Sequence, residues 1–215
     1  MEQYQTDLFA LGAPALRRDA RINRHVRDEH SWLDVGVRWL HGADELLVQL
    51  AQGLRWTAAR REMYGQMVDE PRLGAQLRCP TADAPAIVTE MARSLGEPYG
   101  QRLDSVWVNY YRNGQDSVAW HSDRIGIHPD DSLVAIVSLG GPRKFLLRPK
   151  CGGRSRSYTL ASGDLLVMGG ACQRSWEHSV PKTVLAPPRM SITFRHTRKK
   201  RTPLGAPPQP RAADR

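Results

Sequence analysis

The sequence predicts an α+β protein whose C-terminal half forms short antiparallel strands, as in a β-sandwich or jelly roll. Two observations predict this class. Apolar residues repeat at helical spacing in two segments between residues 44 and 96. Beyond Gly100, short β-branched and aromatic runs alternate with Gly, Pro and Asp turns. Because no helical pattern separates these runs, a doubly wound parallel sheet does not fit.

The first 43 residues are polar and rich in arginine, and we expect them to pack as an arm onto a domain spanning residues 44–197. The first helix is predicted to begin near Asp44, because leucines then recur at helical spacing: Leu46, Leu47, Leu50 and Leu54. The second helix is predicted from a cap at Asp83, with Pro85 in its first turn and a stop at Gly96.

Five runs in the second half have the composition of strands. They cover residues 106–111, 133–139, 144–147, 164–168 and 190–195. Residues 198–215 begin with four consecutive basic residues and continue with several prolines, so we expect a disordered tail.

The chain has 215 residues and a formal net charge of +9, which favours a polyanionic partner such as nucleic acid. A solvated basic surface with a charged tail is the alternative explanation. The three cysteines have no CxxC spacing, which argues against a disulfide framework. No long apolar run is present. We therefore expect a cytoplasmic, monomeric protein that does not bind a membrane.

A candidate metal site consists of His121, Asp123 and His178. Residues two apart in a strand point to the same face, so His121 and Asp123 can bind one ion. His178 must then come from a distant strand that folds back beside them. Two imidazoles and one carboxylate form the facial triad of non-haem Fe(II) oxygenases. A histidine with only structural hydrogen bonds is the alternative for His178.

A candidate anion site lies on two further segments. Alternation places Arg189, Ser191, Thr193 and Arg195 on one face of a strand. Buried arginines need anionic partners, and guanidinium groups match carboxylates in bidentate geometry. Asn109 and Tyr111 share a face by the same rule and can both donate hydrogen bonds to a carboxylate. Ordinary arginine–aspartate pairing on an exposed strand is the alternative.

Together these segments resemble the AlkB family of Fe(II)- and 2-oxoglutarate-dependent dioxygenases, which remove alkyl groups from nucleobases. The matching words, in family order, are LRWTAARREMYG, NYYRNGQDSVAWHSD, AIVSLGGPRKFLLR, LASGDLLVMGG, WEHSVPK and PRMSITFR. The resemblance covers roughly residues 54–197. It implies a double-stranded β-helix (jelly-roll) core with N-terminal helices and a nucleotide-recognition lid.

The resemblance also implies Fe(II), 2-oxoglutarate and O₂ as cofactor and co-substrates. Catalysis by the iron ligands His121, Asp123 and His178 would release formaldehyde and succinate. Arg189, with Asn109, Tyr111 and Ser191, would hold the distal carboxylate of 2-oxoglutarate, while Arg195 serves the end near the metal. The substrate would be an alkylated base in DNA or RNA, flipped or single-stranded.

Substrate contacts are assigned by the same resemblance. Trp56 is similar to a base-stacking tryptophan, although it also follows an apolar helix and fits a core position. The remaining candidates for contacts with the nucleic-acid backbone are Tyr64, Arg60, Arg61, Arg112 and Lys182. Solvated surface charge is the alternative for the arginines.

Three positions depart from the family pattern. Ile125 stands where an acidic residue contacts the base, although Asp130 or Asp131 could substitute. Residues 75–80 lack the tyrosine-rich word of the lid, and Ser191 replaces a common asparagine. Three alternatives therefore stay open: the same chemistry on a tRNA base, the same chemistry on a protein side chain, or a catalytically idle nucleic-acid-binding module.

Overall fold

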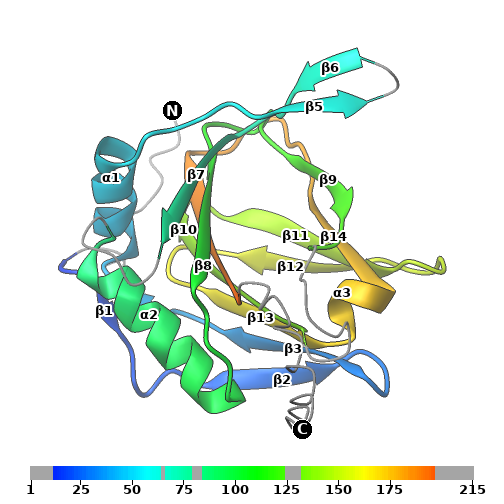
Figure 1. The fold of residues 1–215 in the computed structure, drawn as a ribbon, viewed down its shortest axis with the longest axis horizontal. Coiled ribbons are helices and arrows are strands. Elements are labelled where there is room, and N and C mark those ends of the chain that lie inside the picture. Colours follow the sequence, from blue (N-terminus) through cyan, green and yellow to red (C-terminus); the bar gives the residue numbers. More distant parts are fainter. Residues whose placement is uncertain (1–11, 64–65, 79–83, 124–131, 197–215) are drawn as a thin grey trace, which may run out of the picture.

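The computed structural model describes residues 12–63, 66–78, 84–123 and 132–196 of the chain. Two antiparallel β-sheets face each other, and two helices lie on one side of the larger sheet (Figure 1). The predicted class, an α+β chain with a jelly-roll core, is confirmed. Ile125, Asp130, Asp131, Tyr64 and the tail lie outside the described residues.

The larger sheet has seven strands in the order β2-β3-β13-β10-β15-β8-β7. Their bounds are β2 Ile22–Val26, β3 Ser31–Gly36, β7 Leu73–Arg78, β8 Ser105–Tyr111, β10 Ser132–Gly140, β13 Leu165–Gly170 and β15 Arg189–Arg195. The smaller sheet has four strands in the order β12-β11-β14-β9. Their bounds are β9 Val118–His121, β11 Arg143–Pro149, β12 Arg156–Leu160 and β14 Trp176–Val180. All five predicted strands are thus present.

Two short strand pairs and the helices complete the described fold. The pairs are β1 Ala15–Leu16 with β4 Leu40–His41, and β5 Arg60–Met63 with β6 Gln66–Asp69. The helices are α1 Ala43–Gly53, α2 Ala86–Gly96, a 3₁₀ turn Glu97–Tyr99 and α3 Cys172–Ser175. None of these helices combines the length and apolarity that a membrane span requires.

Both predicted long helices are present, but the start of α2 differs from the prediction. Its N-cap is Pro85, which therefore precedes the first helical turn, and Asp83 lies outside the described residues. The α-helix ends at Gly96 as predicted, but the chain continues directly into the 3₁₀ turn, because Glu97 keeps a helical backbone. The chain leaves the helical conformation at Gly100, where φ is +61°.

Strand alternation divides the core into two layers. Val106 and Val108 of β8 join the apolar cluster between the large sheet and the helices. Tyr111 of the same strand instead joins a second cluster between the two sheets, with Phe145 of β11 and Trp176 of β14. Side chains of one parity on β8 and β15 therefore support the helices, and those of the other parity face the smaller sheet.

The N-terminal segment contributes β2 and β3 to the large sheet, although the domain boundary at residue 43 stays a prediction. Asp34 of β3 ties this segment to the end of α2. Its carboxylate accepts two hydrogen bonds of 2.8 Å from Arg24 and one of 2.8 Å from the hydroxyl of Tyr99. The Asp34 side chain is 6% exposed, so these donors replace the water it loses.

Replacing Asp34 by alanine is expected to lower the free energy of unfolding by about 1–3 kcal/mol, because the partly buried hydroxyl of Tyr99 loses its acceptor. Urea unfolding of the purified variant measures this difference. The matched control is Asp19→Ala, which removes the exposed pair with Arg17 and should change stability by less than about 0.5 kcal/mol. Equal stabilities for the two variants would contradict the assigned role of Asp34.

The described part of the segment expected to belong to the lid, residues 75–78, lies in a strand of the large sheet. Residues 73–78 form β7, the edge strand of the large sheet, and pair along β8. Just before them, the hairpin β5–β6 extends away from both sheets (Figure 1). That a part of this region acts as a nucleotide-recognition lid stays a prediction.

Candidate active site

The predicted metal ligands come together at one end of the smaller sheet. His121 is the last residue of β9 and is the cross-strand partner of His178 on β14. Asp123 follows two residues later, beyond the end of the strand rather than within it as predicted. One potential ligand atom from each residue lies within 4.8 Å of the other two. This spacing suits a single ion bound on one face by the three side chains.

The charge state of the site also suits a cation. Burial lowers the pKa of His178 to about 3, so its imidazole is neutral at physiological pH and keeps a free lone pair. Asp123 Oδ1 forms a 2.6 Å ion pair with Arg195, whereas Oδ2 is buried and has no hydrogen-bond partner among the described residues. A carboxylate oxygen in this situation is stabilised by a bound cation.

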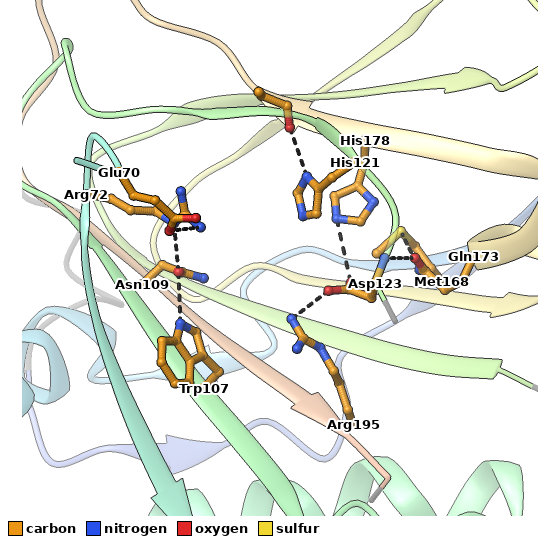
Figure 2. A network of polar contacts seen from close by, with 11 residues as sticks. Glu70, Arg72, Trp107, Asn109, His121, Asp123, Met168, Gln173, His178 and Arg195 are labelled. Carbon is orange, nitrogen blue, oxygen red and sulfur yellow. Dashed lines mark hydrogen bonds and ion pairs between the residues drawn. The ribbon is translucent and has the colours of Figure 1, made fainter. Parts of the chain in front are cut away.

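Neighbouring groups orient the ligands (Figure 2). His121 Nδ1 lies 2.9 Å from the carbonyl oxygen of Ala119, and donation of its proton there leaves Nε2 for a metal. Gln173 of α3 accepts a 2.7 Å hydrogen bond from the backbone N–H of Asp123. The amide nitrogen of Gln173 in turn lies 3.5 Å from the sulfur of Met168. No sequence pattern indicated Gln173, which lies in α3, the short helix directly before the strand that carries His178.

The predicted anion site lies beside the triad on the large sheet. Strand pairing sets Arg189 opposite Tyr111 and Ser191 opposite Asn109. Arg189 is 1% exposed, and its Nε donates a 3.1 Å hydrogen bond to Ser138. The guanidinium lies 5.0 Å from the ring centre of Tyr111. The residues predicted to share a face therefore do share one.

A cavity of about 240 Å³ joins the metal ligands to these residues. It is lined by Arg72, Trp107, Asn109, Tyr111, Val118, His121, Asp123, Ile136, Phe145, His178, Val180, Arg189, Ser191, Thr193 and Arg195. Every residue predicted to bind iron or 2-oxoglutarate is in this set. Arg195 lies at the metal end, where it pairs with Asp123.

The hydrogen bonding of Arg189 and Arg195 indicates whether a dicarboxylate fits this cavity. Burial lowers the pKa of Arg189, and its Nη1 has no hydrogen-bond partner in the described part of the chain. Arg195 Nε is likewise buried without a partner. Buried guanidinium donors that have no acceptor are costly, and a carboxylate would satisfy them in bidentate geometry. The residues present thus fit a metal ion beside a dicarboxylate.

Arg72 and Trp107 line the cavity but were not predicted. Asn109 Oδ1 accepts hydrogen bonds from both: 3.0 Å from Arg72 Nε and 3.1 Å from Trp107 Nε1. Trp107 lies two residues before Asn109 on the same strand, so alternation could have identified it. Arg72 reaches the site from the turn before β7, and no local pattern indicates this.

Of the residues predicted to contact substrate, Trp56, Arg60 and Arg112 do not line the cavity. Trp56 is partly buried against the helix-side core, donates a 3.1 Å hydrogen bond to Ala51 O and lies 5.2 Å from the ring of Tyr110. Arg60 pairs with Asp69 across the β5–β6 hairpin, and Arg112 pairs with Asp116. Their roles toward substrate stay predictions.

A groove of about 490 Å³ adjoins the cavity. It shares Arg72, Val118, His121 and Val180 with the cavity, and Lys182 is one of its further lining residues. Asp69, Glu70 and Trp120 also line it. A ligand in this groove would therefore touch the outer side of the metal site.

Comparison with known proteins agrees with this geometry. The family profile of the 2OG-Fe(II) oxygenase superfamily matches residues 20–195. Human alkB homolog 3, an alpha-ketoglutarate-dependent dioxygenase, is 32% identical over 77% of this chain and 64% of its own length, so the matched part spans less than two thirds of that relative. The human DNA oxidative demethylase ALKBH2 is 31% identical over 80% of this chain and 76% of its own length.

A solved structure supports the fold independently. The structure of OsALKBH1 superposes with a TM-score of 0.58 over 81% of this chain and 100% of that chain, at 15% sequence identity. The jelly roll, the His-Asp-His triad and the family match agree with one another. The chain belongs to the 2OG-Fe(II) oxygenase superfamily and is homologous to its AlkB-type members.

Proposed function

We propose that this chain is an Fe(II)- and 2-oxoglutarate-dependent dioxygenase that removes N-linked alkyl groups from nucleobases. One observation carries the proposal: the His121, Asp123 and His178 ligand set lines the same cavity as the buried, incompletely paired Arg189. The homology to two AlkB-type relatives supports the substrate class, because one of them is named a DNA oxidative demethylase.

Each side chain has a defined task in this proposal. The triad would hold the iron, and Arg189, with Asn109, Tyr111 and Ser191, would hold the distal carboxylate of 2-oxoglutarate. Arg195 neutralises charge near the metal and fixes Asp123 through their ion pair. When bound, the iron with O₂ and 2-oxoglutarate supplies the oxidising power to hydroxylate an N-methyl carbon, and formaldehyde then leaves the repaired base.

The neighbouring groove supports access for a nucleic-acid strand. Its wall includes His121, so an occupant reaches the metal ligands without passing through the core. A base must leave its stack to enter such a site, which favours single-stranded or flipped substrates. The net charge of +9 attracts the phosphate backbone, and binding should weaken steeply as salt is added.

The proposal is tested with a single-stranded oligonucleotide that carries one 1-methyladenine. It is incubated with the protein, Fe(II), ascorbate, 2-oxoglutarate and air, and its mass is then measured. We expect the loss of one methylene mass, with succinate formed in equal amount, and no loss when 2-oxoglutarate is omitted. A parallel incubation with 3-methylcytosine reports base preference.

The other outcomes identify the alternatives. Consumption of 2-oxoglutarate with an unchanged oligonucleotide would reject a repair role on this substrate and favour a tRNA base or a protein side chain. Binding of the oligonucleotide without any consumption of 2-oxoglutarate would favour an idle nucleic-acid-binding module. The complete metal triad argues against that last reading, because a module without turnover has no need of it.

A further inference from the structure

Arg72 connects the co-substrate cavity to the neighbouring groove. It lines both spaces, and its guanidinium is engaged at two ends (Figure 2). Nε donates a 3.0 Å hydrogen bond to Asn109 Oδ1 in the cavity. Nη2 lies 2.7 Å from Glu70 Oε2, and Glu70 lines the groove but not the cavity. The two side chains are only 17% and 19% exposed, so the pair is well shielded from water.

This contact determines which way the amide of Asn109 points. Arginine Nε and tryptophan Nε1 can only donate, so the atom between Arg72 and Trp107 must be the amide oxygen. The amide nitrogen consequently faces away from both donors. Asn109 is paired with Ser191 on β15 and lines the cavity, so the NH₂ group is the part available to a carboxylate there.

We propose that Arg72 is a positioning residue for 2-oxoglutarate, which acts by holding the amide of Asn109 with its donor group toward the co-substrate. Glu70, which lines the groove, binds the other end of the Arg72 guanidinium and so helps to fix its orientation. The inference rests on the proposed use of 2-oxoglutarate. It assigns a role in co-substrate affinity to Glu70, a residue outside the co-substrate cavity.

A purely structural role is the competing explanation, since the Arg72–Glu70 pair also bridges the turn between β6 and β7. If the pair has only a structural role, its loss lowers the stability of the protein without changing the affinity for 2-oxoglutarate. Alternatively, its loss changes that affinity equally with and without the side chain of Asn109. Coupling between Arg72 and Asn109 separates the two explanations, because residues that act through one hydrogen bond have non-additive effects.

The test measures 2-oxoglutarate binding by calorimetry on the full chain loaded with Mn(II), so that no turnover is needed. Arg72→Gln is expected to raise Kd about tenfold, since a charge-assisted hydrogen bond to the asparagine is lost. Glu70→Gln should raise it about threefold, because Arg72 keeps a weaker, neutral partner. The matched control is the exposed pair between Arg93 of α2 and Glu97 of the following 3₁₀ turn, in which Arg93→Gln and Glu97→Gln should leave Kd unchanged.

The decisive comparison uses Asn109→Ala as background. There, adding Arg72→Gln should change Kd by less than twofold, because the amide that it positions is gone. A full tenfold loss in that background, or an unchanged Kd in the single variant, would overturn the proposal. Melting curves of all variants identify any that fail to fold, and if Arg72→Gln is one of them, Glu70→Gln, which acts on Arg72, replaces it in both backgrounds. Wild-type binding of 2-oxoglutarate without dealkylation would reject the proposed substrate while leaving the Arg72 result valid.

Discussion

Replacing Asp123 by alanine is expected to abolish both iron retention and 2-oxoglutarate turnover. The variant loses the only carboxylate of the triad, which supplies one ligand and part of the charge that neutralises the cation. It also leaves the guanidinium of Arg195 without its 2.6 Å partner beside the metal position. The positive charge of Arg195 then repels a metal cation in the same partly enclosed site. Metal analysis of the purified variant and succinate production under saturating 2-oxoglutarate measure the two effects.

Asp123→Asn separates the two contributions. Asparagine keeps an oxygen for Arg195 and a possible metal ligand but removes the negative charge, so we expect weak iron binding and no more than residual turnover. Asp19→Ala, in an exposed pair far from the site in sequence, serves as the control and should keep full activity. Normal iron content and turnover in Asp123→Ala would reject the triad.

The parts of the site that lie on regular strands could be predicted from the sequence. Arg189, Ser191 and Arg195 line one cavity because side chains alternate along β15, and the same alternation places Asn109 and Tyr111 opposite them. On β15 the residues of the other parity, Met190, Ile192 and Phe194, are apolar and pack toward the helices. A two-residue period with buried apolar residues on one side leaves few other ways to place these side chains.

The parts that depend on long-range pairing could not be predicted in this way. That His178 lies opposite His121 follows from the pairing of β14 with β9, which local patterns do not encode. Arg72 and Gln173 reach the site from a turn and from a one-turn helix. Such positions have no periodicity, so their side-chain directions emerge only from the packed structure.

Trp56 illustrates a different limit. Its motif suggested a base-stacking residue, and its position after an apolar helix suggested the core. In the structure the indole N–H donates to Ala51 O and the ring packs beside Tyr110, at the border of the helix-side core. One aromatic side chain can serve both packing and stacking, so motif and burial do not exclude one another.

Replacing Arg189 by methionine is expected to weaken 2-oxoglutarate binding by more than tenfold without destabilising the ligand-free protein. The guanidinium is 1% exposed, and burial lowers its pKa. Its Nη1 lacks a hydrogen-bond partner in the described chain, so the ligand-free fold carries an incompletely compensated charge. Methionine fills a similar volume without that charge, and such replacements are often neutral or stabilising. The lost carboxylate pair accounts for about 2–5 kcal/mol of binding.

Thermal unfolding with and without 2-oxoglutarate, in the presence of Mn(II), measures both quantities in one experiment. A ligand that binds only the folded state raises Tm in proportion to the logarithm of its concentration over Kd, so the wild type should gain stability and the variant should not. The ligand-free variant should melt at or above the wild-type temperature, and Arg93→Met on the exposed face of α2 should keep the full ligand-induced gain.

A variant that melts early without ligand would mean that Ser138 and Tyr111 already satisfy the guanidinium. A variant that keeps the ligand-induced gain would place the distal carboxylate elsewhere in the cavity. Loss of 2-oxoglutarate binding with retained stability is the result expected if Arg189 serves to bind an anion. If Arg189 served to stabilise the fold, its replacement would lower the stability of the ligand-free protein.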